Sequence, residues 1–316
     1  MRTFLVTLLS STIAFTAPGA AQENILYADR LSLTLDTYKR VFGLYEPVFV
    51  TYSVENNTQT RVNAIVQMSY SFHKIEFSIT FPDGHTKEFI TGSIADGILM
   101  EKTYAPGIVG VSEVEMITNG ATGELAFPVT GKYKIQARMW VGNHLEGQPQ
   151  SVYIRAEPLE IEVQEPVGVD AEAIQFFSSK EEIVQLLGEG SVAYCKRSRD
   201  AECFGRVSKF LDQHPNSAYT PAILWDVADS VATGMLNVSS RSQTAIGLYN
   251  TFLGRWPDHP VAPRVMYRLA TALDAAGRKQ EAVALVGRFE TTFPGRKDLL
   301  DLMRMNILHV RPESVK

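Results

Sequence analysis

The spacing of hydrophobic residues changes once along this chain, at Pro166. Before it, apolar and polar residues alternate in short runs such as LSLTLD (31–36), PVFVTYSV (47–54) and KIEFSITF (74–81). A period of two is typical of strands with one buried face. After it, apolar residues recur three and four positions apart, which is typical of amphipathic helices. The sequence therefore predicts a β-rich half and a helical half, joined by PVGVD (166–170).

The first residues have the pattern of an export signal. Arg2 precedes an apolar run from Phe4 to Phe15, and small residues follow up to Ala21. This run is too short to span a bilayer, so we predict a cleaved signal peptide at 1–21, with an uncleaved anchor as the alternative. No cysteine lies near the cleavage site, and no later stretch is long and apolar enough for a membrane helix. We expect a soluble mature chain, periplasmic or secreted, with no membrane span after signal cleavage.

Charge argues against a nucleic-acid partner. Residues 22–167 hold 11 Lys and Arg against 18 Asp and Glu, and residues 168–316 hold 18 against 17. Binding to nucleic acid requires a clustered positive face, which neither half predicts.

The β-rich half resembles a known family of modules. FPVTGKYKIQARMWV places Gly131 and Tyr133 before a long alternating run, LEIEVQEP supplies a last strand, and YEPVFVTYSVENNT an earlier one. These segments are similar to bacterial immunoglobulin-like and fibronectin-like modules. The resemblance implies an all-β sandwich over 25–165, with a tyrosine that hydrogen-bonds back across a corner.

A motif that contains two prolines occurs twice in the helical half. FLDQHPNSAYTPAILW begins at residue 210, and FLGRWPDHPVAPRVMY begins 42 residues later. Proline cannot continue a helix but fits its first turn. We therefore predict that Pro215 and Pro257 end helices, and that Pro221 and Pro263 begin the next ones.

The stretch YRLATALDAAGRKQEAVALVGRFETTFPG (267–295) resembles a tetratricopeptide repeat, because the small residues Ala270 and Ala282 would let two antiparallel helices approach closely. The resemblance implies all-α helical-hairpin repeats (tetratricopeptide-like) over 171–316, following the immunoglobulin-like all-β sandwich. In that family the first helix of each pair lines a groove. The groove positions implied here are Trp225, Asp229, Arg264, Tyr267, Thr271 and Asp274.

Trp225 and Tyr267 are the expected anchors for a peptide, since aromatic residues carry much of the binding free energy at interfaces. Replacing either by alanine is expected to weaken binding by about 1 to 3 kcal/mol. The alternative is that both rings pack between helices or against the sheets.

We found no motif for catalysis, phosphate binding or metal binding, and the six histidines are scattered singly. We predict no catalytic residue, no cofactor and no metal. Glu113 with Glu115, and Glu160 with Glu162, each share one strand face, which we expect to be solvated rather than an acid and base couple.

These observations predict a non-enzymatic protein-interaction or scaffold protein of the cell envelope, which binds a protein or peptide. The alternative is a carbohydrate-binding accessory protein that uses Trp140 and Tyr153. A hydrolase with an unrecognised site is a third interpretation.

Cys195 and Cys203 are the two cysteines, eight residues apart. An exported chain would join them in a disulfide worth about 2 to 3 kcal/mol, although a free thiol also suits the buried position predicted for Cys203. We expect mass spectrometry of the non-reduced mature protein to find them bonded. Two thiols that alkylate without reduction would contradict the pairing.

Overall fold

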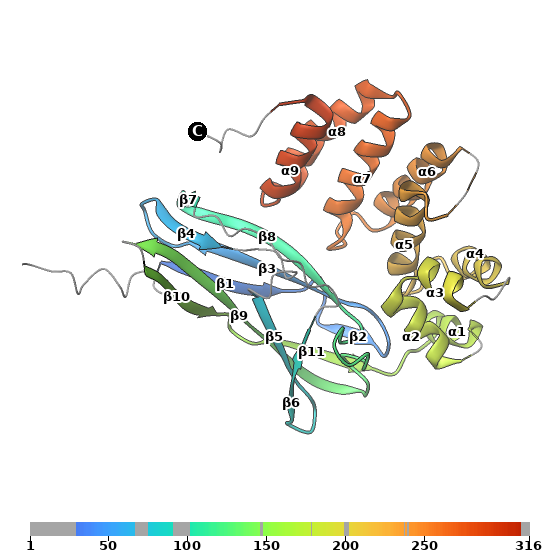
Figure 1. Cartoon of the computed structure of the whole chain (residues 1–316). Coiled ribbons are helices and arrows are strands. Elements are labelled where there is room, and N and C mark those ends of the chain that lie inside the picture. Colours follow the sequence, from blue (N-terminus) through green and yellow to red (C-terminus); the bar gives the residue numbers. More distant parts are fainter. Residues whose placement is uncertain are drawn as a thin grey trace, which may run out of the picture.

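The computed structural model describes residues 30–66, 75–90, 102–145, 148–177, 179–198, 202–236, 238 and 240–310. The predicted signal peptide lies outside these residues. Strands come first along the described chain and helices follow (Figure 1). The last strand ends at Gln164 and the first helix begins at Val169, so the element type changes within the predicted linker.

The strands form two sheets. One has three strands in the order β1-β3-β8, and the other has eight, with β9 pairing with β4, β5, β10 and β11. The strand bounds are β1 (Leu31–Asp36), β2 (Val41–Gly43), β3 (Val48–Asn56), β4 (Val62–Val66), β5 (Ile75–Thr80), β6 (Thr86–Phe89), β7 (Lys102–Tyr104), β8 (Gly107–Met116), β9 (Gly131–Leu145), β10 (Gln148–Arg155) and β11 (Leu159–Gln164).

Alternating residues of both sheets build the first hydrophobic core. Val50 and Tyr52 of β3 and Ile135 of β9 are fully buried in it. Tyr133, at the start of β9, is also buried, and its hydroxyl donates to the carbonyl of Val129 at 2.7 Å. The period of two in the sequence therefore corresponds to the face of each strand that lines this core.

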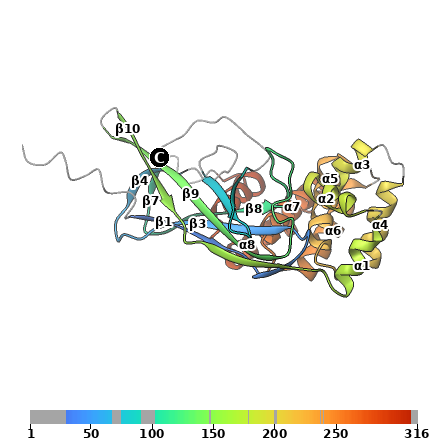
Figure 2. The same ribbon diagram turned by 90° about the horizontal axis from the view of Figure 1, so that it is seen from below.

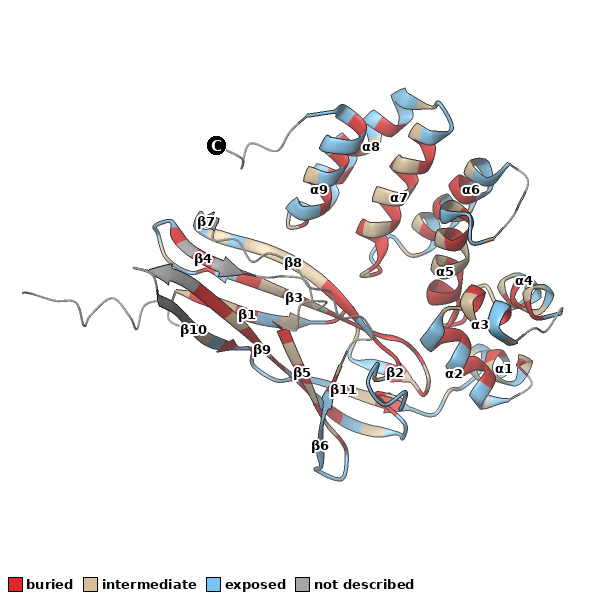
Figure 3. Cartoon of the chain, viewed as in Figure 1, coloured by how far each residue is buried: buried red, intermediate tan, exposed pale blue. Residues whose placement is uncertain are grey.

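The helices pack mainly as antiparallel neighbours, and Figure 3 shows buried residues on the sides of α5, α6 and α7 that face one another. Their bounds are α1 (Val169–Phe176), α2 (Lys180–Glu189), α3 (Ser191–Ser198), α4 (Cys203–Gln213), α5 (Thr220–Thr233), α6 (Arg241–Arg255), α7 (Ala262–Ala275), α8 (Lys279–Thr292), α9 (Lys297–Met303) and the π-helical turn η2 (Arg304–Leu308).

The repeated motif behaves as predicted. Pro215 and Pro257 follow the ends of α4 and α6, and Pro221 and Pro263 lie in the first turns of α5 and α7. The prediction that FLxxxPxxxxxP ends one helix and begins the next is confirmed. Its cause is the missing amide hydrogen of proline, which costs nothing in a first turn.

The predicted fold class, an all-β immunoglobulin-like sandwich followed by all-α tetratricopeptide-like repeats, is wrong. The architecture is mixed, because strands and helices share hydrophobic cores. Phe49 of β3 is buried in the core of α5 to α9, and Ile117, just after β8, is buried in the core of α1 to α5. In addition, β2 pairs with β11 in parallel, and α1 to α3 are much shorter than α5 to α8. Apolar periodicity indicates which element forms, but not which neighbour covers each face.

The helices cover one side and one end of the sheets. Figures 1 and 2 show α1 to α6 beyond one end of the strands, whereas α7 and its neighbours lie over β8. Helix α9 contacts β8 directly. Gly295, just before α9, lies close to the side chain of Val111 in β8.

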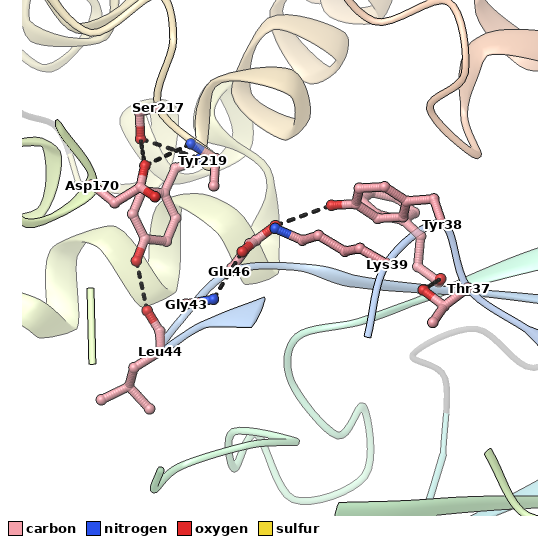
Figure 4. Close-up of polar contacts among 11 residues, drawn as sticks. Thr37, Tyr38, Lys39, Gly43, Leu44, Glu46, Asp170, Ser217 and Tyr219 are labelled. Carbon is pink, nitrogen blue, oxygen red and sulfur yellow. Dashed lines mark hydrogen bonds and ion pairs between the residues drawn. The ribbon is translucent and has the colours of Figure 1, made fainter. Parts of the chain in front are cut away.

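A buried polar joint connects the β2–β3 turn to the helices (Figure 4). Tyr219, at the start of α5, is fully buried and donates to the carbonyl of Leu44 at 2.7 Å. In the same region Glu46 is buried, accepts from the amide of Gly43 at 2.9 Å and the hydroxyl of Tyr38 at 3.0 Å, and pairs with Lys39. Burial raises the pKa of Glu46, and Lys39 opposes that shift. The polar groups of this joint are satisfied by one another, as burial requires.

His259 adds an aromatic contact between the two parts of the chain. Its ring lies 4.8 Å from that of Phe49 and 5.5 Å from that of Phe252, measured between centroids. Its Nδ1 accepts from the amide of Val261 at 3.2 Å. Burial, with a smaller contribution from Lys39, lowers the pKa of His259 to about 4.

This shift predicts that the protein becomes less stable in acid. Because the pKa in the folded chain lies below the unfolded value of 6.5, the unfolded chain binds more protons between pH 6.5 and 4. Protonation of His259 should therefore lower the free energy of unfolding by up to about 3 kcal/mol as the pH falls through this range. The His259→Asn variant keeps an acceptor for the Val261 amide. In urea unfolding at several pH values, its free energy of unfolding should fall less steeply with decreasing pH than that of the wild type. His309→Asn, at an exposed histidine, is the control, and equal slopes for all three proteins would refute the assignment.

Candidate functional site

A groove lies between β8 and the helices. It comprises a recess of about 390 Å³ and a neighbouring one of about 250 Å³, which share Glu115, Leu187, Gly188 and Trp225. The floor comes from β8 and the residues after it, and the walls come from the end of α2, from α5 and from the first turn of α7. The charged residues of the lining are Glu113, Glu115, Glu189, Asp226, Asp229 and Arg264.

Two glutamates of β8 lie on the face of the strand that is turned towards the helices. Val114 and Met116 point into the core between the sheets, so Glu113 and Glu115 lie on the opposite face. In the ladder with β3, Glu115 stands opposite Phe49, whose side chain belongs to the helical core. The prediction of a shared strand face thus agrees with the register. The expectation that this face is solvated is wrong for Glu113, which is 3% exposed, because helices cover it.

Glu113 is held by two arginines from the helical half. Its Oε2 accepts from Nη1 of Arg296 at 2.6 Å, and its Oε1 pairs with Nε of Arg264. Arg296 precedes α9, is itself buried, and also bonds Asp298. A buried carboxylate requires such compensation, because desolvating a lone charge is costly. The cluster of Glu113, Arg264 and Arg296, hereafter the Glu113 clamp, therefore ties β8 to α7 and α9.

Glu115 differs from Glu113 in having no ion pair among the described residues. Burial in the groove, and then the carboxylate of Asp226, raise the pKa of Glu115 to about 7, whereas Arg264 lowers it. Part of the side chain remains in contact with water, which limits this upward shift. A carboxyl group that binds a proton near neutral pH is typical of functional sites.

Helix α5 supplies the opposite wall. Trp225 is half-buried, and its ring lies 6.3 Å from that of Tyr249. Asp226 uses Oδ2 to accept from the hydroxyl of Ser191 at 2.5 Å and from the amide of Val192 at 3.0 Å, and so satisfies the N-terminus of α3. One turn later, Asp229 pairs with Arg268 of α7 at 2.8 Å.

The structure divides the predicted groove residues into two sets. Trp225, Asp229 and Arg264 lie at the groove described above. The other three lie further along α7. The Tyr267 hydroxyl accepts from Asn306 of η2 at 3.1 Å, the Thr271 hydroxyl donates to the carbonyl of Tyr267, and Asp274 pairs with Lys279 at 2.9 Å.

Sequence reasoning missed Glu113, Glu115 and Asp226 as site residues. The signal for the first two was their spacing of two on a strand, which we interpreted as a solvated face. Asp226 follows Trp225 directly, but its role depends on α3, which is more than thirty residues away in the chain.

The cysteines lie outside the groove. Cys195 of α3 and Cys203 of α4 form a disulfide, with a Cα–Cα distance of 5.4 Å, which links the two helices. Within the described ranges, no group of three or more His, Cys, Asp or Glu side chains could hold a metal ion. No helix of those ranges is long and apolar enough to cross a membrane.

No protein-family model and no curated protein matches the chain. Some solved structures are similar to parts of it. A CARDB domain from Pyrococcus furiosus is 14% identical over 42% of this chain and 94% of that domain, with a TM-score of 0.23. A DNA glycosylase for alkylpurines from Pseudomonas fluorescens is 13% identical over 43% of this chain and 30% of its own, with a TM-score of 0.25. A sporulation control protein from Bacillus subtilis is 16% identical over 46% and 55%, with a TM-score of 0.23.

Likenesses as weak as these do not indicate a tetratricopeptide repeat, and they carry no argument about function.

The Glu113 clamp generates a stability prediction. Glu113→Gln leaves two arginines beside a neutral amide, and breaking a buried ion pair in this way costs about 3 to 5 kcal/mol. We expect urea unfolding to show a loss of about 3 kcal/mol. The control is Glu160→Gln, which removes the exposed pair with Lys134 and should cost less than about 1 kcal/mol. Equal losses in the two variants would mean that the clamp does not join the sheets to the helices.

Proposed function

We propose that this protein is a non-enzymatic interaction protein that binds a peptide segment of another protein in the groove between β8 and the helices. The observation that carries this proposal is the position of Trp225, half-buried on the wall shared by both recesses. Large aromatic side chains in partly desolvated pockets usually supply most of the binding free energy of an interface. The larger recess, about 390 Å³, is within the range of about 300 to 1,000 Å³ that is common for ligand sites.

The groove is supported on both sides, which favours binding. The Glu113 clamp holds α7 against β8, and the joint of Tyr219 with Leu44 holds the start of α5 against the β2–β3 turn. A preorganised site loses less conformational entropy when a partner binds. Two charged residues of the lining, Glu113 and Arg264, are already engaged with each other, which supports a structural role for them rather than a chemical one.

The carbohydrate alternative has less support, because the aromatic residues that suggested it are engaged elsewhere. Tyr153 donates its hydroxyl to Glu76 at 2.9 Å, and the guanidinium group of Arg138 lies 4.8 Å from the centre of its ring. The Trp140 ring lies over Gly142, where a Cβ atom would overlap it. A sugar would have to displace these contacts in order to stack on either ring.

We place this function in the periplasm or outside the cell. The apolar pattern of residues 1–21 supports export, and a disulfide between Cys195 and Cys203 suits an oxidising compartment. The partner in this proposal is a protein of the cell envelope.

Trp225→Ala tests the proposal. Peptides would be selected from a random display library on the wild-type mature protein, and their affinities measured by fluorescence anisotropy. Loss of a buried aromatic anchor should weaken the selected peptides by about 1 to 3 kcal/mol, which corresponds to about five- to 150-fold.

Trp256→Ala is the matched control. Trp256 is also half-buried in the helical half, where it packs on Phe252, and it does not line the groove. The control should reduce the melting temperature without weakening the peptides. If every selected peptide binds Trp225→Ala as tightly as wild type, the groove is not the binding site.

A further inference from the structure

The charges of the groove are not balanced. Among the described residues, three of its carboxylates have cationic partners: Glu113 has Arg264 and Arg296, Asp229 has Arg268, and Glu189 has Arg197. Glu115 and Asp226 have no ion pair within the described chain. They face each other across the groove, one from β8 and one from α5, and both line the smaller recess. This recess therefore carries an excess of negative charge when both carboxyl groups are ionised.

Neither carboxylate is fully used by the fold. Both hydrogen bonds to Asp226 go to Oδ2, so Oδ1 has no hydrogen-bond partner among the described residues. Capping α3 requires an oxygen acceptor rather than a charge, and an asparagine would also supply it. Glu115 stabilises no helix end and closes no ion pair, and it lies near a like charge, which is unfavourable without a counterion.

An aromatic ring completes the site. Trp225 precedes Asp226 in α5 and lines both recesses together with Glu115. Indole is the best aromatic partner for an ammonium or guanidinium group. Two carboxylates and an indole form a set of groups suited to an organic cation, and the charge of that cation complements the groove.

We infer that the bound segment carries a lysine or arginine whose charged group lies between Glu115 and Asp226 and against Trp225. This inference rests on the proposed peptide-binding function and names its partner class, a basic segment of a protein. A bare divalent cation fits less well, because Ca²⁺ and Mg²⁺ take at least six oxygen ligands.

The inference also predicts how affinity depends on pH. Because burial and the carboxylate of Asp226 raise the pKa of Glu115, a smaller fraction of this side chain is charged at pH 6 than at pH 8, so a basic peptide should bind more weakly at pH 6. The other charged groups that face the site are Glu113, Glu189, Asp226, Asp229 and Arg264. His259, which contacts Phe49 beside the groove, has its pKa lowered to about 4 and stays neutral over this interval.

The test uses the full mature chain and peptides selected on it from a random display library at about pH 8. We expect lysine or arginine in the peptides whose binding depends on Trp225. Replacing that residue by norleucine should weaken binding to wild type about tenfold, as should Glu115→Gln or Asp226→Asn. On the Glu115→Gln variant, the norleucine peptide should bind only slightly more weakly than the lysine or arginine peptide. The affinity of this variant for the basic peptide should also depend much less on pH. Glu160→Gln, at an exposed carboxylate remote from the groove, is the control.

The outcomes separate this inference from the function on which it rests. Peptides that depend on Trp225 but bind norleucine and lysine forms equally would overturn the basic partner and leave the peptide-binding groove. Peptides that bind only when a divalent cation is present, and are released by EDTA, would reassign the two carboxylates to a metal ion. If no selected peptide depends on Trp225, both the function and the inference fail.

Discussion

The buried contact of Glu113 with Arg264 and Arg296 joins the two halves of this protein. A carboxylate at 3% exposure is stable only if cationic groups replace the water that it has lost. Both cations come from the helical half, one from the first turn of α7 and one from the segment before α9. The charge of the strand is thus compensated only when the helices are in place.

The groove lies beside this contact, because Glu113 and Arg264 are among its lining residues. The Glu113 clamp and the hydrogen bond of Tyr219 with Leu44 each connect the sheets to the helices. Between β8 and the helices a recess remains. Glu113 and Glu115 show the difference, since they lie two positions apart on the same face of β8. Glu113 pairs with two arginines, whereas Glu115 lines a recess together with Asp226 and Trp225. Two glutamates on one face of β8 therefore have different surroundings.

Shared hydrophobic cores connect the β-rich and helical halves of the chain. Phe49 alternates with Val48 and Val50, which face the core between the sheets, yet its own side chain is buried among helices. A strand that is apolar on both faces needs a covering layer on each. The helices provide the second layer here, at one end of β3, and His259 lies against the ring of Phe49.

Local sequence determined the element types and many helix boundaries, because apolar periodicity and proline chemistry act over a few residues. Pro221 and Pro263 could be assigned to first turns from the repeated motif alone. The resemblance to tetratricopeptide repeats implied that Trp225 lines a groove formed by helices, whereas the groove that it lines lies between β8 and the helices. What only the tertiary structure decided is which charges meet. Glu115 and Asp226 are more than one hundred residues apart in the chain, and no local pattern reports that, among the described residues, docking of the helices leaves this pair without a cationic partner, because that depends on where the cations are held.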